Sequence, residues 1–88
     1  MQREPRRWRT PFGKWVRKYG VHRLTAALQS SEQPVTDKAV YDWVSGRCVP
    51  RPERALAVAR LARGQIRLGD IYAHREQVLR GTRTALIR

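Results

Sequence analysis

One amphipathic stretch decides the fold: Thr36-Asp37-Lys38-Ala39-Val40-Tyr41-Asp42-Trp43-Val44-Ser45-Gly46. Thr36 is a good helix N-cap, because its hydroxyl oxygen accepts a hydrogen bond from a backbone amide of the first turn. Asp37 suits the positive end of the helix dipole, and Gly46 suits a helix stop. The stretch therefore predicts a helix over residues 36–45.

The apolar and polar side chains of this helix separate onto two faces. Val35, before the cap, and Val40, after it, have the spacing of a hydrophobic staple. The buried face is predicted to contain Ala39, Val40 and Trp43. The opposite face presents Thr36, Lys38, Tyr41 and Asp42.

Two further helices precede this one. Thr10 as N-cap and Pro11 at the first helical position begin a helix in which Trp15 and Tyr19, four residues apart, share a face. Gly20 ends it. A second helix over residues 21–28 turns three apolar side chains inward, those of Leu24, Ala27 and Leu28.

Two more helices follow. Residues 53–63 predict a helix that Gly64 closes, with an inner stripe of Leu56, Ala59 and Ala62. Residues 70–80 predict a fifth helix that stops at Gly81, with an inner stripe of Ile71, Tyr72, Val78 and Leu79. No stretch alternates as a strand does, so the expected fold class is all-α, a small bundle of four to five helices.

The chain of 88 residues suits one domain. Residues 1–9 have no helical period and read as a basic flexible arm, which is ordered on a partner or simply solvated. Residues 10–64 form the helical domain. Residues 65–88 form a C-terminal helix and tail, a candidate dimerisation element, because so small a core favours a partner.

The chain is strongly basic, with 19 Lys and Arg against 7 Asp and Glu, a net charge of +12. Of these cations 16 are Arg, which favours planar, bidentate contacts with phosphate or guanine. Residues 1–25 carry a net +7, residues 26–50 a net −1 and residues 51–88 a net +6. Nucleic acid is the partner that such a charge favours. The cations Arg60, Arg63 and Arg67 fit phosphate binding or solubility equally well.

Several classes of function are excluded. One Cys and two distant His cannot form a disulfide framework or a common zinc site, and no catalytic dyad or phosphate loop is present, so we expect no enzyme, no metal and no cofactor. No small-molecule substrate is expected. The short apolar runs predict no membrane span, and no secretory signal is visible. The expected location is the cytoplasm, in association with the nucleoid.

Three segments carry a resemblance to a known family: Gly20 to Leu28, Val35 to Trp43, and Ser45-Gly46-Arg47 with Val49-Pro50. Together they resemble the Cro and phage-repressor type (lambda repressor-like) of helix-turn-helix domain over roughly residues 12–63. The sequence departs from the family between the two motif helices, where the connection is longer by about five residues, at Ser30 to Pro34.

The resemblance implies that the helix over residues 36–45 reads bases from the major groove, with Thr36, Lys38, Tyr41 and Asp42 facing the DNA. It implies phosphate contacts from His22, Arg23, Arg47 and Arg51. The arm is expected to lie in a minor groove through its arginines, Arg3, Arg6, Arg7 and Arg9. Two simpler roles stay open: Asp37 as a helix-start residue, and Asp42 as the i,i+4 partner of Lys38.

The expected function is that of a sequence-specific regulator of transcription that binds double-stranded DNA. It would be a small phage or mobile-element repressor that binds an inverted-repeat operator as a homodimer. One alternative is a non-specific or RNA-binding basic protein, which the long connection between the motif helices and the acidic groups at Asp37 and Asp42 favour. The other is an antitoxin-like module that holds a protein partner.

Overall fold

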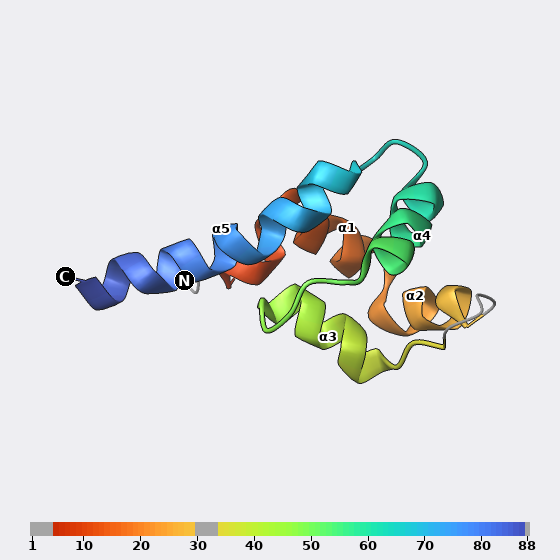
Figure 1. Ribbon diagram of the computed structural model, residues 1–88, viewed down its shortest axis with the longest axis horizontal. Coiled ribbons are helices and arrows are strands. Elements are labelled where there is room, and N and C mark those ends of the chain that lie inside the picture. The colour runs from red at the N-terminus through yellow and green to blue at the C-terminus, as the bar shows by residue number, and fades with distance from the viewer. Residues whose placement is uncertain (1–4, 30–33, 88) are drawn as a thin grey trace.

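A computed structural model describes residues 5–29 and 34–87, the last seven of them by their backbone alone. Every regular element in these ranges is helical (Figure 1). The elements are η1 (Arg6–Trp8), α1 (Pro11–Tyr19), α2 (Val21–Leu28), α3 (Asp37–Ser45), α4 (Pro52–Ala62) and α5 (Leu68–Ile87). The predicted all-α class, with a small bundle of five α-helices, is confirmed.

The ends of α1 and α3 lie where the caps predict them. The Thr10 hydroxyl accepts a hydrogen bond from the Gly13 amide at 2.9 Å, and the Thr36 hydroxyl accepts one from the Ala39 amide at 3.1 Å. Gly20 and Gly46 end the two helices with φ of 103° and 86°, a region of backbone conformation that favours glycine. Local sequence thus sets both helices before any tertiary contact is considered.

A single apolar core joins the helices. α1 contributes Phe12, Trp15 and Val16, and α2 contributes Leu24 and Leu28. From α3 and the residue before its cap come four further buried side chains, those of Val35, Val40, Trp43 and Val44. Trp15 and Trp43 are therefore core residues, as their positions on the apolar faces predict.

The inner stripe of α4 differs from the prediction. Leu56 is 44% exposed, whereas Ala55, Val58 and Ala62 are buried and Ala59 is half-buried. The prediction was wrong because residues 55–59 are all apolar, so hydrophobic periodicity does not identify the inward face of this helix. The helix also begins one residue earlier, at Pro52, which occupies a first-turn position that suits proline.

The C-terminal helix is longer than predicted. It begins at Leu68 and continues through Gly81, the predicted stop, as far as Ile87. A glycine costs a helix only about 1 kcal/mol relative to alanine, so it does not end a helix by itself. Tyr72, expected to be inward, is 40% exposed, and the buried position falls instead on His74, three residues beyond the buried Ile71. The last turns of α5 extend beyond the other helices (Figure 1).

The expected flexible arm is wrong for its second half. Arg6–Trp8 form the 3-10 helix η1, and Trp8 is half-buried against the core. η1 packs on α1, α3 and α5, and the Arg7 carbonyl lies so close to Gly13 that a Cβ at this glycine would collide with it. The first part of the arm, with Arg3, lies outside the described residues.

α5 holds the end of α3 in place. The His74 ring lies 2.7 Å from the Val44 carbonyl oxygen through Nε2 and 2.5 Å from the Thr10 hydroxyl through Nδ1. One residue further, Arg75 Nε donates to the Gly46 carbonyl at 3.0 Å. α3 is therefore fixed by its buried side chains and, at its C-terminus, by two side chains of α5.

Candidate nucleic-acid interface

The polar face of α3 is open to solvent. The Lys38 side chain is 81% exposed and Tyr41 is 53% exposed, while Val40 and Trp43 point into the core. Tyr41 is a large aromatic residue on a helix whose opposite face is fully packed, so nothing in the core explains its position. Both side chains, which belong to the predicted base-reading set, are accessible to a partner.

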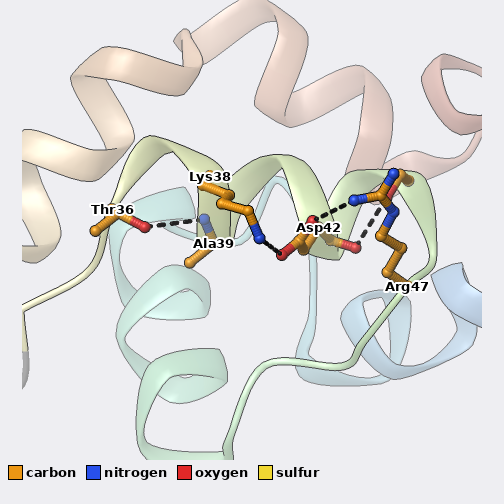
Figure 2. Close-up of polar contacts among 6 residues, drawn as sticks. Thr36, Lys38, Ala39, Asp42 and Arg47 are labelled. Carbon is orange, nitrogen blue, oxygen red and sulfur yellow. Dashed lines mark hydrogen bonds and ion pairs between the residues drawn. The ribbon is translucent and has the colours of Figure 1, made fainter.

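Thr36 has a structural task in addition to its place on this face. Its hydroxyl oxygen accepts the hydrogen bond from the Ala39 amide that caps α3 (Figure 2). The hydroxyl hydrogen is not used by that bond, and the residue is exposed. Thr36 can therefore donate a hydrogen bond to a partner while it still caps the helix.

Asp42 lies between two cations. Lys38 Nζ is 3.4 Å from its Oδ2 atom and Arg47 Nη1 is 3.4 Å from its Oδ1 atom (Figure 2). The Arg47 amide also donates to the Asp42 carbonyl at 3.0 Å, which ties the loop after α3 to the helix. The simpler role for Asp42, as the i,i+4 partner of Lys38, is confirmed. Asp42 keeps both cations on one side of α3.

The two predicted phosphate contacts at the start of α2, His22 and Arg23, lie in different surroundings. The His22 side chain is 91% exposed and lies 3.4 Å from Asp37 Oδ2, so it lies beside the beginning of α3. The Thr25 side chain lowers the pKa of Asp37 most, and His22 adds to this effect. Arg23, the next residue, instead lies over the Tyr19 ring, 4.2 Å from its centroid. His22 of this pair therefore lies beside α3, whereas Arg23 lies over a ring of α1.

The remaining predicted cations are exposed on neighbouring elements. Arg51 is the N-cap residue of α4, and its side chain makes no cap hydrogen bond. Arg6, Arg7 and Arg9 are exposed on and just after η1, which packs on α3. The structure thus places the described part of the arm next to α3 in a defined conformation.

The long connection between α2 and α3 is tied at both described ends. Gln29 Nε2 donates to the Val35 carbonyl, and Arg54 Nη2 donates to the Pro34 carbonyl at 3.4 Å. Val35 is buried, and α2 packs directly against α3. Most of the predicted insertion, residues 30–33, lies outside the described residues. The two helices are neighbours although their connection is long.

Sequence reasoning missed the burial of His74 and the contact of Arg23 with Tyr19, although the spacing of these residues gave a weak indication of each. His74 is buried, and it continues the stripe of Ile71 and Val78 at helical spacing. Arg23 lies over the ring of Tyr19, four residues earlier, and a guanidinium close to an aromatic residue in the sequence is a weak signal of a cation–π contact. Neither contact can be read from sequence alone, because each joins two helices.

The part of the chain that the structure describes contains neither a candidate metal site nor a candidate membrane-spanning helix. It contains no group of three His, Cys, Asp or Glu side chains placed to hold a metal ion. It also contains no helix with both the length and the apolar character that crossing a membrane requires.

No family model, curated protein or solved structure matches this chain.

Proposed function

We propose that this protein is a sequence-specific regulator of transcription that binds double-stranded DNA through the polar face of α3. The observation that carries the proposal is a helix anchored on one face by Val40 and Trp43, with Lys38 and Tyr41 exposed on the other. A rigid helix with an exposed polar face is what insertion into a major groove requires, because that groove admits one α-helix.

Each exposed group of α3 has a chemical role in this proposal. Lys38 donates to O6 or N7 of a guanine, and Tyr41 contacts a thymine methyl group or a phosphate. Thr36 donates its free hydroxyl hydrogen to a base or phosphate at the helix start. Phosphates are held by His22, Arg47 and Arg51 and by the arginines of η1, which supply affinity but no sequence choice.

Asp42 sets the electrostatics of the face. A carboxylate repels phosphate, but this one is paired with Lys38 and Arg47, so little net negative charge faces the DNA. On close approach the same carboxylate can accept a hydrogen bond from a cytosine amino group. Surface ion pairs contribute only about 0.2–1 kcal/mol, so Lys38 and Arg47 are easily released to new partners.

The regulator is proposed to act as a homodimer on an inverted repeat. A two-fold axis would place two copies of α3 about one helical turn of DNA, roughly 34 Å, apart. The protruding part of α5 is the element proposed to join the copies. In this proposal, occupation of the operator blocks polymerase. Such a repressor acts in the cytoplasm, at the nucleoid.

The test is selection of duplexes from a random pool, followed by competition binding. We expect one duplex site to be preferred over random duplex by roughly 10³-fold or more. The double variant Lys38→Ala/Tyr41→Ala should lose this preference with little change in Tm, because both side chains are exposed. The matched control Lys14→Ala/Leu56→Ala removes one cation and one exposed apolar group away from α3 and should keep the preference.

Two results would overturn the proposal. One is site selection that survives in the Lys38→Ala/Tyr41→Ala variant, since α3 would then not read the bases. The other is tighter binding to folded or single-stranded RNA than to any selected duplex. That result would favour the alternative of an RNA-binding basic protein, which the long connection between α2 and α3 and the acidic residues of α3, Asp37 and Asp42, support.

A further inference from the structure

A groove lies between α1, α2 and α4, away from α3. Its volume is about 640 Å³, and its walls include Tyr19, Arg23, Ala57, Arg60, Leu61 and Arg63. A second hollow shares Tyr19, Arg23, Leu61 and Arg63 with it and extends it to Lys18. No residue of α3 lines either hollow. The groove is therefore a separate feature from the proposed DNA-reading face.

The Arg23 guanidinium lies at this groove over an aromatic ring. The rings of Trp15 and Tyr19 stack with their centroids 4.8 Å apart, and Arg23 covers the Tyr19 ring at 4.2 Å. Trp15 is buried, so the stack begins in the core and ends at the guanidinium. Stacking engages the flat face of a guanidinium and leaves its edge, which carries the N–H donors, available to a ligand.

The charge of the groove is of one sign. Lys18, Arg23, Arg60 and Arg63 line it, and no Asp or Glu does. Four cations outside the groove, His22, Lys38, Arg47 and Arg80, lie within ion-pair distance of a carboxylate. Cations gathered on low-dielectric walls without carboxylates concentrate anions.

Arg63 adds an independent observation. It has φ of 49° and is the only non-glycine residue with positive φ in the described ranges. A left-handed conformation is unfavourable for an ordinary L-residue, and such strain gathers at functional positions. Here the residue that ends α4 in this conformation is one whose side chain lines the groove, although Gly64 follows directly.

We infer that this groove binds a phosphate ester. Guanidinium groups match phosphate oxygens in bidentate geometry, and Arg23 on α2, with Arg60 and Arg63 at the end of α4, supplies donors from two sides of the groove. Ala57 and Leu61 give an apolar wall for the organic part of the ligand. The volume lies within the range of about 300–1,000 Å³ that is usual for small-ligand pockets. The phosphate belongs to a free nucleotide or to a nucleic-acid backbone.

The experiment is isothermal titration calorimetry of the full chain with two probes. The first probe is a nucleoside triphosphate without magnesium, and the second is a duplex of random sequence. The groove variant is Arg23→Gln/Arg60→Gln. The matched control, Lys14→Gln/Arg67→Gln, removes the same charge from exposed positions that do not line the groove. Tm values of both variants show whether each is folded.

We expect the groove variant to bind at least one probe about tenfold more weakly or worse, and the control variant to bind it nearly as the unmodified protein does. A loss with the nucleotide identifies a free ligand, and a loss with the duplex alone identifies the backbone. The inference is overturned if neither probe binds saturably at millimolar concentration, or if both variants lose affinity equally. The Lys38→Ala/Tyr41→Ala variant should keep groove binding, so failure here is separable from failure of the proposed function.

Discussion

His74 of α5 donates a hydrogen bond from Nε2 to the backbone carbonyl of Val44 in α3, over 2.7 Å. A carbonyl only accepts, so Nε2 carries the hydrogen and Nδ1 of the neutral ring accepts from the Thr10 hydroxyl at 2.5 Å. The ring is 1% exposed and meets the edge of the Phe12 ring, with centroids 5.0 Å apart. One neutral histidine thus joins the start of α1 and the end of α3 to α5.

This contact makes stability depend on pH. Burial lowers the pKa of His74, and the hydrogen bond to Val44 offsets part of that effect. The unfolded chain therefore binds the proton more readily than the folded chain does. The contribution of His74 is complete above about pH 6.5, the ordinary histidine pKa, and is lost progressively as the pH falls from there toward the lowered value.

Chemical unfolding at several pH values measures this effect. We expect the free energy of unfolding to fall as the pH is lowered below about 6.5, and the slope to shrink in His74→Gln. An unchanged slope in His74→Gln would show that another group titrates.

The contact between η1 and α1 depends on a glycine. A Cβ at Gly13 would collide with the Arg7 carbonyl, which belongs to backbone and cannot rotate away. We expect Gly13→Ala to lower the free energy of unfolding by about 1–3 kcal/mol, a typical cost of overpacking. Gly69→Ala is the matched control, since no atom lies within 4 Å of its added Cβ. Near the start of α5 it should be neutral or stabilising, and urea denaturation of both variants decides the point.

Trp43 anchors α3 to the core. It is 3% exposed, and we expect Trp43→Ala to cost about 3–5 kcal/mol, enough to unfold a domain of this size. Leu56→Ala removes an apolar side chain that is 44% exposed, and its cost should be much smaller. Thermal unfolding followed by circular dichroism compares the two. Equal losses would contradict the inward face assigned to α4.

Asp42 restrains two cations of the proposed DNA-binding face. Asp42→Asn removes its negative charge and releases Lys38 and Arg47, so affinity for duplexes of any sequence should rise. The slope of log affinity against log salt should steepen by up to about one for each additional phosphate that these cations neutralise. Glu53→Gln removes an exposed carboxylate from the first turn of α4 and serves as control. An equal rise in affinity in both variants would show that the effect comes from the change in net charge and not from the release of Lys38 and Arg47.

Much of the candidate site follows from the α3 segment alone. Thr36 as cap, Gly46 as stop and the inward side of Val40 and Trp43 are short-range consequences of residue type and spacing, so sequence predicts them. The same spacing places Lys38 and Tyr41 on the outer side. The Lys38–Asp42 pair also follows, because residues four apart on a helix are neighbours.

Only the tertiary structure decided which face of each helix is buried and which side chains of different helices contact each other. α4 offers apolar side chains almost all round, so packing against its neighbours selects Ala55 and Val58 over Leu56. η1, the burial of His74 and the direction of Arg23 arise from contacts between residues far apart in sequence or on different helices. Local sequence sets the helices because caps and periodicity act within a few residues. Their faces, and the groove between them, depend on which surfaces meet.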